Sequence, residues 1–284
     1  MARPLLVFIH IPKTAGRSLE TMLRSTYGVR YYHAVPWAPQ RAAGEHGDGF
    51  SLPTYDHADF RRLRRLSPGM RAVGGHQIAL WSDLHAITPC RYFTFLREPL
   101  ARGASAYLYH RDTEPDPLTW EQWLAWPEHH AHQTRYLDRG GDPQGAIDAI
   151  ERLGVFVGLM EHYEESLLLM KKLVAPELNP AYRRVNVGRS SGRARELLDD
   201  PAAAAELHRI HAADFPVYAH VRDVLWPRWC EAYGPGLAED AERLRADPER
   251  GFNFLNAKAQ RGVRRFWVNP WMKVLEEKEP RGRR

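Results

Sequence analysis

Continuous apolar runs alternate with amphipathic segments over the first two thirds of the chain. The runs LLVFIH at 5–10, RYFTFL at 91–96 and GVFVGL at 154–159 predict strands that are buried on both faces. RAVGGH at 71–76 is a candidate for a further short strand. After three of these runs the apolar residues recur at helical spacing, so strands and helices are expected to alternate.

The expected helices cover residues 17–27, 99–109, where proline stands in the first turn, and 161–174. A long, mostly helical stretch at 201–232 is expected to be interrupted at Pro216. Strands that alternate with helices pair in parallel through right-handed crossovers. The sequence therefore predicts an α/β fold, a doubly wound parallel sheet flanked by helices.

Chemically active residues follow three of the predicted strands, at 10–18, 76–77 and 97–98. Ligands of such sheets bind beyond the carboxyl ends of the strands, so we expect these segments to meet at one edge. Two long connections, 28–68 and 111–150, are too long for plain turns and are expected to shape a cleft for a second substrate.

The bulk composition favours an anionic small-molecule ligand. The chain has 284 residues, a formal net charge of +5 and 44% hydrophobic residues, which is ordinary for a globular protein. Its 40 basic and 35 acidic residues are too evenly balanced to indicate nucleic acid. Cys90 and Cys230 offer no disulfide framework and are expected to be reduced and mostly buried.

The N-terminal apolar run is short, contains His10 and lacks a small-residue cleavage site, so it does not resemble a signal peptide. No segment approaches the ~20 apolar residues that a transmembrane helix needs. The expected location is cytoplasmic.

PKTAGRS at 12–18 lies between a predicted strand and a predicted helix, where backbone N–H groups and the helix dipole favour an anion. Lys13 adds a charge, and Thr14 and Ser18 add hydroxyl donors. The order G-x-x-x-x-G-K-[ST] of triphosphate-binding loops is missing, and so is an aspartate that would hold magnesium. The loop thus indicates a phosphate-like group handled without a metal. The alternative is an ordinary turn whose hydroxyl caps the helix.

A second motif, FLREPLARGASAY at 95–107, places Arg97 at a strand end and Ser105 on the following helix. The guanidinium fork of arginine matches two oxygens of a terminal phosphate. The alternative is an arginine that simply pairs with Glu98.

Together the two motifs resemble those of sulfotransferases that use 3′-phosphoadenosine 5′-phosphosulfate (PAPS), whose 5′-phosphosulfate loop has the pattern P-K-T-G-[GT]-[ST]-[ST]. GGH at 74–76 and VFVGLMEHYEESLLLM at 155–170 are similar to segments of the carbohydrate 2-O-sulfotransferase branch, as are RVNVGRSSGRA and ADFPVYAHVRDVL. The resemblance covers about residues 5–230. It implies a P-loop-like sulfotransferase domain at 1–232 and leaves 233–284 as a charged C-terminal extension with the aromatic cluster RRFWVNPW.

The resemblance implies PAPS as donor, 3′-phosphoadenosine 5′-phosphate (PAP) as product and no metal. The 5′-phosphosulfate would lie on the loop and the 3′-phosphate on the second motif, with a basic loop around Asn186 as a cover over the nucleotide. The donor-binding residues it implies are Lys13, Thr14, Ala15, Gly16, Arg17, Ser18, Arg97, Ser105, Arg189 and Arg193. Ala15 and Arg17 depart from the family pattern, which usually has glycine and a small hydroxyl residue there.

Two residues are predicted to carry the chemistry. Lys13 would stabilise the negative charge on the leaving phosphate. His76, at a strand end, would act as the general base because histidine titrates near neutral pH. Its alternative is a structural histidine bonded to a carbonyl. His10 and His33 are the reserve candidates for the base.

Three further segments are interpreted more simply. The histidines of HHAH at 129–132 lack the spacing of a zinc site and are expected to be polar helix or loop residues. The tryptophans at 120, 123 and 126 recur at helical spacing, which indicates a packed face, with stacking on a sugar as the alternative. RRFWVNPW is interpreted as a packing or dimer patch or, as a weaker alternative, an interfacial anchor.

The sequence therefore predicts a sulfotransferase that acts on a hydroxyl group, with a saccharide as the expected acceptor. A magnesium-dependent kinase and a non-catalytic nucleotide-binding module are the alternatives. A homodimer is left open.

Overall fold

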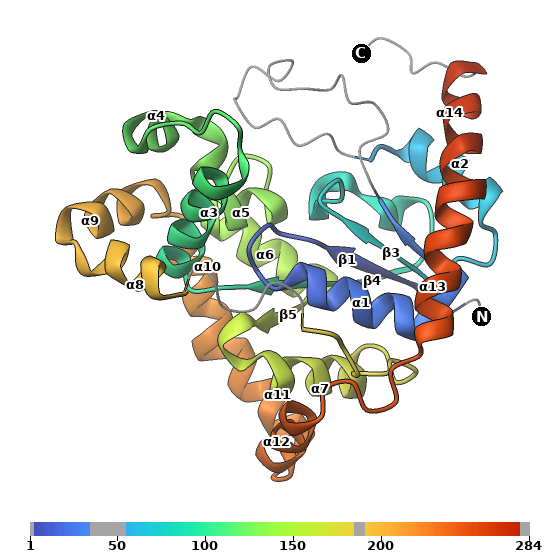
Figure 1. Ribbon diagram of the computed structural model, residues 1–284. Coiled ribbons are helices and arrows are strands. Elements are labelled where there is room, and N and C mark those ends of the chain that lie inside the picture. The colour runs from blue at the N-terminus through green and yellow to red at the C-terminus, as the bar shows by residue number, and fades with distance from the viewer. Residues whose placement is uncertain (1–2, 35–54, 185–190, 279–284) are drawn as a thin grey trace.

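The computed structural model of the chain describes residues 3–34, 55–184 and 191–278. Its centre is a five-stranded sheet in the order β2-β3-β1-β4-β5, in which every neighbouring pair is parallel. The strands are β1 (Leu5–Ile9), β2 (Tyr31–His33), β3 (Ala72–Gly75), β4 (Cys90–Leu96) and β5 (Phe156–Leu159). Helices cover both faces of the sheet (Figure 1), which confirms the predicted α/β class.

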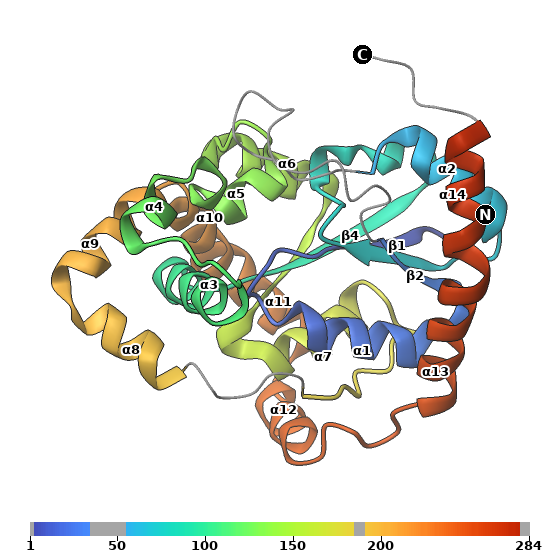
Figure 2. The same cartoon turned by 45° about the horizontal axis from the view of Figure 1, so that its top comes forward.

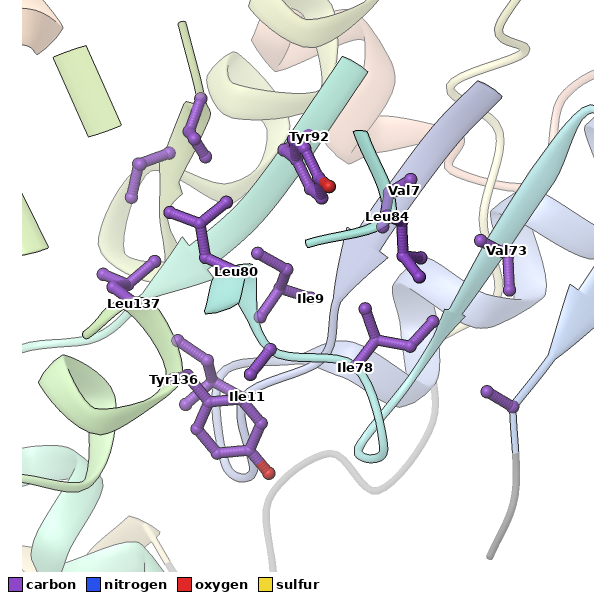
Figure 3. Close-up of a cluster of buried hydrophobic side chains, with 14 of the residues drawn as sticks. Val7, Ile9, Ile11, Val73, Ile78, Leu80, Leu84, Tyr92, Tyr136 and Leu137 are labelled. Carbon is purple, nitrogen blue, oxygen red and sulfur yellow. The ribbon is translucent and has the colours of Figure 1, made fainter. Parts of the chain in front are cut away.

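The central strand β1 is a continuous apolar run because both of its faces are buried. Val7 and Ile9 point into one cluster together with Tyr92 of β4 (Figure 3). Leu6 and Phe8 point into a second cluster on the other face. Alternate side chains of a strand lie on opposite faces of its sheet, so a doubly covered strand needs apolar residues at every position.

The helices divide between these clusters. The Val7 face packs against α2 (His57–Leu66), α5 (His132–Leu137), α6 (Pro143–Leu153) and α10 (Asp214–His220). The Phe8 face packs against α1 (Gly16–Tyr27), α7 (Tyr163–Leu173), α11 (Trp226–Tyr233) and α12 (Leu237–Ala246). A third cluster joins α3 (Pro99–Thr113), α4 (Trp120–Ala125), α8 (Ser191–Asp199) and α9 (Pro201–Ile210) beside the sheet (Figure 2).

Two sequence-based expectations differ from the structure. The pattern did not predict β2, whose three residues lie at the start of the long connection 28–68. The interruption expected at Pro216 was wrong, since the chain turns at 211–213 and Pro216 lies in the first turn of α10. A proline is tolerated there because the first N–H groups of a helix have no partner within it.

The C-terminal helices α13 (Phe254–Val263) and α14 (Asn269–Lys278) lie along the β2 edge of the molecule (Figures 1 and 2). Asn256 donates a hydrogen bond to the Ser25 carbonyl at 3.0 Å. Val268 and Met272 belong to the cluster that contains Val7. A domain boundary at residue 232 stays a prediction.

Both cysteines are free, as expected, but they are half-buried rather than buried. Burial raises the pKa of the Cys90 thiol to about 11. Over the described ranges, no helix is both long enough and apolar enough to cross a membrane.

Candidate active site

The carboxyl ends of four adjacent strands bring polar side chains to one edge of the sheet. Following the strand order, His33 ends β2, His76 follows β3, His10 follows β1 and Arg97 follows β4. The three strand ends expected to meet therefore do so. Strand β2 adds His33, which the sequence had given only as a reserve base.

The loop between β1 and α1 leaves the start of the helix without a side-chain cap. Lys13 and Ala15 both adopt positive φ, 71° and 63°, a conformation that non-glycine residues seldom take. Ala15 caps α1 without a side-chain hydrogen bond, and the first turn holds no acidic residue. Backbone strain of this kind concentrates at ligand-binding sites, and uncapped N–H groups at a helix start attract anions.

Thr14 has a different role from the one expected. Its hydroxyl is fully buried and donates to the Ile11 carbonyl at 2.9 Å, so its proton holds the loop together and is not directed to a ligand. Its backbone lies between two residues of positive φ, and a part for it in anion binding stays a prediction.

Two glycines allow the close approach of the strand ends. A Cβ on Gly16 would lie 1.7 Å from Nε2 of His10, so the His10 ring covers the first residue of α1. Gly75 has φ 148°, and a Cβ there would lie 2.2 Å from the Ala34 carbonyl oxygen. Glycine at 75 therefore lets β3 end close to the chain that leaves β2, which places His76 beside His10.

Four basic side chains gather around the loop. Burial lowers the pKa of Lys13 to about 8, and repulsion from Arg97, Arg17 and Arg102 adds to the shift. The Lys13 ammonium lies 3.9 Å from the ring centroid of Tyr109 on α3. Positive charges held together cost free energy, and a bound anion offsets that cost.

Arg97 does not form the ion pair with Glu98 that was its alternative explanation. The Glu98 carboxylate caps α3, accepting hydrogen bonds from the Leu100 and Ala101 N–H groups at 3.1 and 2.7 Å. Among the described residues, no hydrogen bond or ion pair to the Arg97 guanidinium is present. Burial lowers the pKa of Arg97, although Glu161 and Glu98 oppose the shift.

One face of α3 continues the site. Arg102, Ser105 and Tyr109 recur at spacings of three and four residues and so share a face, and Tyr109 contacts Lys13. Arg102 is fully buried and donates to Nε2 of His211 at 3.1 Å, while His211 donates from Nδ1 to Asp214 at 3.1 Å. This network fixes α3 against the segment before α10, and with it the position of Ser105.

A buried carboxylate joins two of the histidines. Glu20 of α1 accepts a hydrogen bond from Nδ1 of His10 at 3.1 Å, and Nδ1 of His33 lies 2.8 Å from the same oxygen. Its other oxygen accepts from Arg24 at 3.0 Å. Burial alone would raise the pKa of Glu20, but the contacts with His10 and His33 hold it well below its usual range. The Nδ1–H of His10 is thereby fixed, and its Nε2 faces Gly16.

His76 is oriented by the main chain. Its Nδ1 donates to the His10 carbonyl at 2.8 Å, so Nε2 is the unprotonated nitrogen that can accept a proton. The rings of His10 and His76 lie 3.8 Å apart. Burial lowers the pKa of His76 to about 3, with repulsion from His10 as a further cause. The expectation of a base with a near-neutral pKa was therefore wrong for the free protein.

Three residues of this site were not predicted: Glu20, Arg102 and Tyr109. Arg193, expected at the 3′-phosphate, forms a bidentate ion pair with Asp112 at the end of α3 instead. Arg189 and Asn186 lie outside the described residues. The assignment of Arg17, which is exposed, and of Ser18, which is buried, to the donor stays a prediction.

The histidines of 129–132 each donate to a main-chain carbonyl, at 2.6 to 2.8 Å, and so act as polar structural residues. Trp123 is fully buried in the third cluster and Trp120 packs against it, as expected of a packed face. Trp126 is 41% exposed.

The lowered pKa of Lys13 predicts that a bound anion makes the protein take up protons. Near pH 8 the Lys13 amine is about half protonated, and a phosphate beside it favours the charged form. Affinity for an anion bound beside Lys13, with PAP as the probe, should therefore fall as the pH rises above about 8. Titration calorimetry at pH 8 in buffers of different ionisation enthalpy measures the uptake. The variant Lys13→Met should abolish it, and equal uptake in that variant would assign the proton to another group.

The fold and site together define an α/β protein with a strand–loop–helix whose helix start is uncapped, and with basic side chains at the end of the neighbouring strand β4. Its sequence is similar to that of carbohydrate sulfotransferases. Galactose-3-O-sulfotransferase 3 of Bos taurus is 29% identical over 275 residues, covering 86% of this chain and 62% of the relative. The proteins of that name from Homo sapiens and Mus musculus are 28% and 26% identical, with the same coverage.

These similarities confirm the resemblance to carbohydrate sulfotransferases, although the chain spans less than two thirds of the length of these relatives. A crystal structure of a sulfotransferase from Alicyclobacillus acidocaldarius aligns with a TM-score of 0.42 and 20% identity, over 75% of this chain and 97% of that one. No protein-family model matches the chain.

Proposed function

We propose that the protein is a PAPS-dependent sulfotransferase that transfers a sulfuryl group to a hydroxyl of a saccharide. The observation that carries the proposal is the group of basic side chains around the uncapped start of α1, where burial first, and then repulsion from these side chains, lowers the pKa of Lys13. Such a group favours a ligand with several negative charges, and PAPS carries a phosphosulfate and a separate 3′-phosphate. No metal is required to neutralise them.

Each residue of the site has a separate role in the proposed reaction. Backbone N–H groups at 14–16 and Lys13 hold the 5′-phosphosulfate, and Arg97 holds the 3′-phosphate. As the acceptor oxygen bonds to sulfur, the bond from sulfur to the phosphate oxygen breaks. Nε2 of His76 takes the acceptor's proton, and Lys13 stabilises the charge that builds on the departing phosphate. The products are the sulfate ester and PAP.

The low pKa of His76 in the free protein changes how this base works. The negative charge of the donor beside His76 raises its pKa, since an opposite charge favours the protonated form. His76 is thus neutral in the free protein, and the bound donor makes it a stronger base by raising its pKa. Glu20 supports this arrangement by fixing His10, whose carbonyl orients His76.

Galactose is the first acceptor to test, because the curated relatives are named for transfer to the 3-hydroxyl of galactose. A cytoplasmic location and a homodimer stay predictions.

A nucleotide panel tests the donor and separates the alternatives. Calorimetric titration with PAP, ADP, ATP and ATP with magnesium should show tight binding of PAP alone, without a metal. A preference for magnesium-ATP would support a kinase. Tight PAP binding without turnover on any hydroxyl would support a non-catalytic module.

Arg97→Ala should weaken PAP binding far more than binding of adenosine 5′-phosphosulfate, which lacks the 3′-phosphate. Loss of a charge-assisted hydrogen bond from a half-buried site costs about 1.5–3 kcal/mol, or roughly 10- to 150-fold in affinity. Arg91→Ala is a matched control, because Arg91 is an exposed residue at the start of the same strand. Equal weakening of both ligands would show that Arg97 binds another group.

A further inference from the structure

Exposed apolar side chains are concentrated on the C-terminal helices. The large hydrophobic residues that are exposed in the described chain number ten, and six of them fall within 254–271. They are Phe254, Leu255, Val263, Phe266, Trp267 and Trp271, with exposed fractions from 37% to 81%. Exposed large apolar side chains that gather on one element mark a place of interaction.

The helix that carries these residues is continuous from 254 to 278, because a π-helical turn at 264–268 joins α13 to α14. Its inner face is occupied: Ala257, Gln260, Val268 and Met272 are buried. The exposed apolar residues fall at 255, 263, 266, 267 and 271, spacings that place them on a face away from these. The helix thus has two apolar faces. The inner face packs against the rest of the protein, and the outer face is exposed.

Basic residues accompany the outer face. Lys258, Arg261 and Arg265 are exposed and recur at spacings of three and four residues, which sets them in a row along the helix. Lys273 is a further exposed cation, and the sequence from 250 to 275 contains no aspartate or glutamate. The Arg265 guanidinium lies 5.4 Å from the ring centroid of Phe266. The face therefore combines aromatic rings with positive charge.

We propose that this face, defined by Leu255, Val263, Phe266, Trp267 and Trp271 with their basic neighbours, docks the protein on an anionic phospholipid surface. Tryptophan and phenylalanine enter the boundary between headgroups and acyl chains, while lysine and arginine reach the lipid phosphates. A second copy of the chain is a poorer fit, because a two-fold contact on this face would bring its cations together. The proposal does not depend on the activity proposed above.

Vesicle sedimentation with the full-length protein tests the proposal. The protein should bind vesicles that contain phosphatidylserine, bind pure phosphatidylcholine vesicles much more weakly, and dissociate as salt is raised. The variant Phe266→Ser/Trp267→Ser/Trp271→Ser should lose about tenfold or more in affinity. Each charge reversal among Lys258→Glu, Arg261→Glu and Arg265→Glu should lower the affinity about fivefold or more, since it removes one attraction and adds a repulsion.

Matched controls are available elsewhere on the surface. Trp126→Ser removes an exposed tryptophan of α4's C-terminal cap, and Lys171→Glu reverses an exposed lysine of α7. Both should bind vesicles like the unchanged protein. Circular dichroism and the Tm confirm that each variant folds.

Equal binding of the triple serine variant, or no binding of the unchanged protein to anionic vesicles, would overturn the proposal. So would a concentration-dependent dimer that the triple variant abolishes while vesicle binding stays the same.

Discussion

Lys13→Met is expected to lower turnover about 10²–10³-fold and also to weaken binding of the donor nucleotide. The Lys13 ammonium lies in the loop where the phosphosulfate is proposed to bind, and a charge that grows on the leaving oxygen needs a donor at that place. Because the ligand is already anionic before the reaction, the same charge contributes to ground-state binding. Single-turnover rates and calorimetric titration with PAP measure the two effects separately.

The control is Lys171→Met, an exposed lysine on α7 whose loss should change neither quantity. Removing Lys13 also removes like-charge repulsion from the free protein, so the Lys13→Met variant should be folded and no less stable. A variant that kept normal turnover but bound PAP weakly would restrict Lys13 to binding and remove it from the reaction.

His76→Ala is expected to lower turnover about 10²–10⁴-fold and to leave PAP binding nearly unchanged, as the loss of a general base does. The measurement pairs turnover with calorimetric titration. His220→Ala is the control, since His220 lies on α10 and pairs with Glu151. Retention of most activity in His76→Ala would make His76 structural and direct the search to His10 and His33, which the structure places at the same edge.

The pH dependence adds a further check on His76. Burial lowers its pKa to about 3, so the free protein keeps the group neutral and able to accept a proton as the pH falls from 7 to 5. The pH profile of kcat/KM for the donor, which reports the free protein, should therefore show no acidic limb from His76 in that range. With donor bound the pKa is higher, and the acidic limb of kcat should lie at higher pH than that of kcat/KM. A kcat/KM limb near pH 6.5 that disappears in His76→Ala would show that the histidine is less buried in solution.

Much of the site could be predicted because it lies where apolar runs end. The ends of β1, β3 and β4 are visible in the sequence, and parallel strands bring them to one edge. Strand β2 was missed because its three residues are too few for any period to show. Its absence from the prediction left His33 without a position.

The contacts that orient the histidines could not be predicted. Glu20 lies between Leu19 and Thr21 in α1, and nothing local indicates that its carboxylate faces inward to meet His10 and His33. The low pKa of His76 depends on burial between neighbouring strands, a property of the packed fold and not of the sequence around GGH. The pairing of Arg193 with Asp112 likewise joins helices that are far apart in the chain.

Transfer of radiolabelled sulfate from PAPS to an oligosaccharide with terminal galactose tests the central claim most directly. We predict a labelled saccharide whose formation persists in EDTA, falls about 10²–10³-fold in Lys13→Met and is unchanged in Lys171→Met. An oligosaccharide whose galactose is blocked at the 3-hydroxyl should not be labelled if that hydroxyl is the position of transfer. If PAP binds tightly but no saccharide or other hydroxyl compound becomes labelled, the protein is not a sulfotransferase.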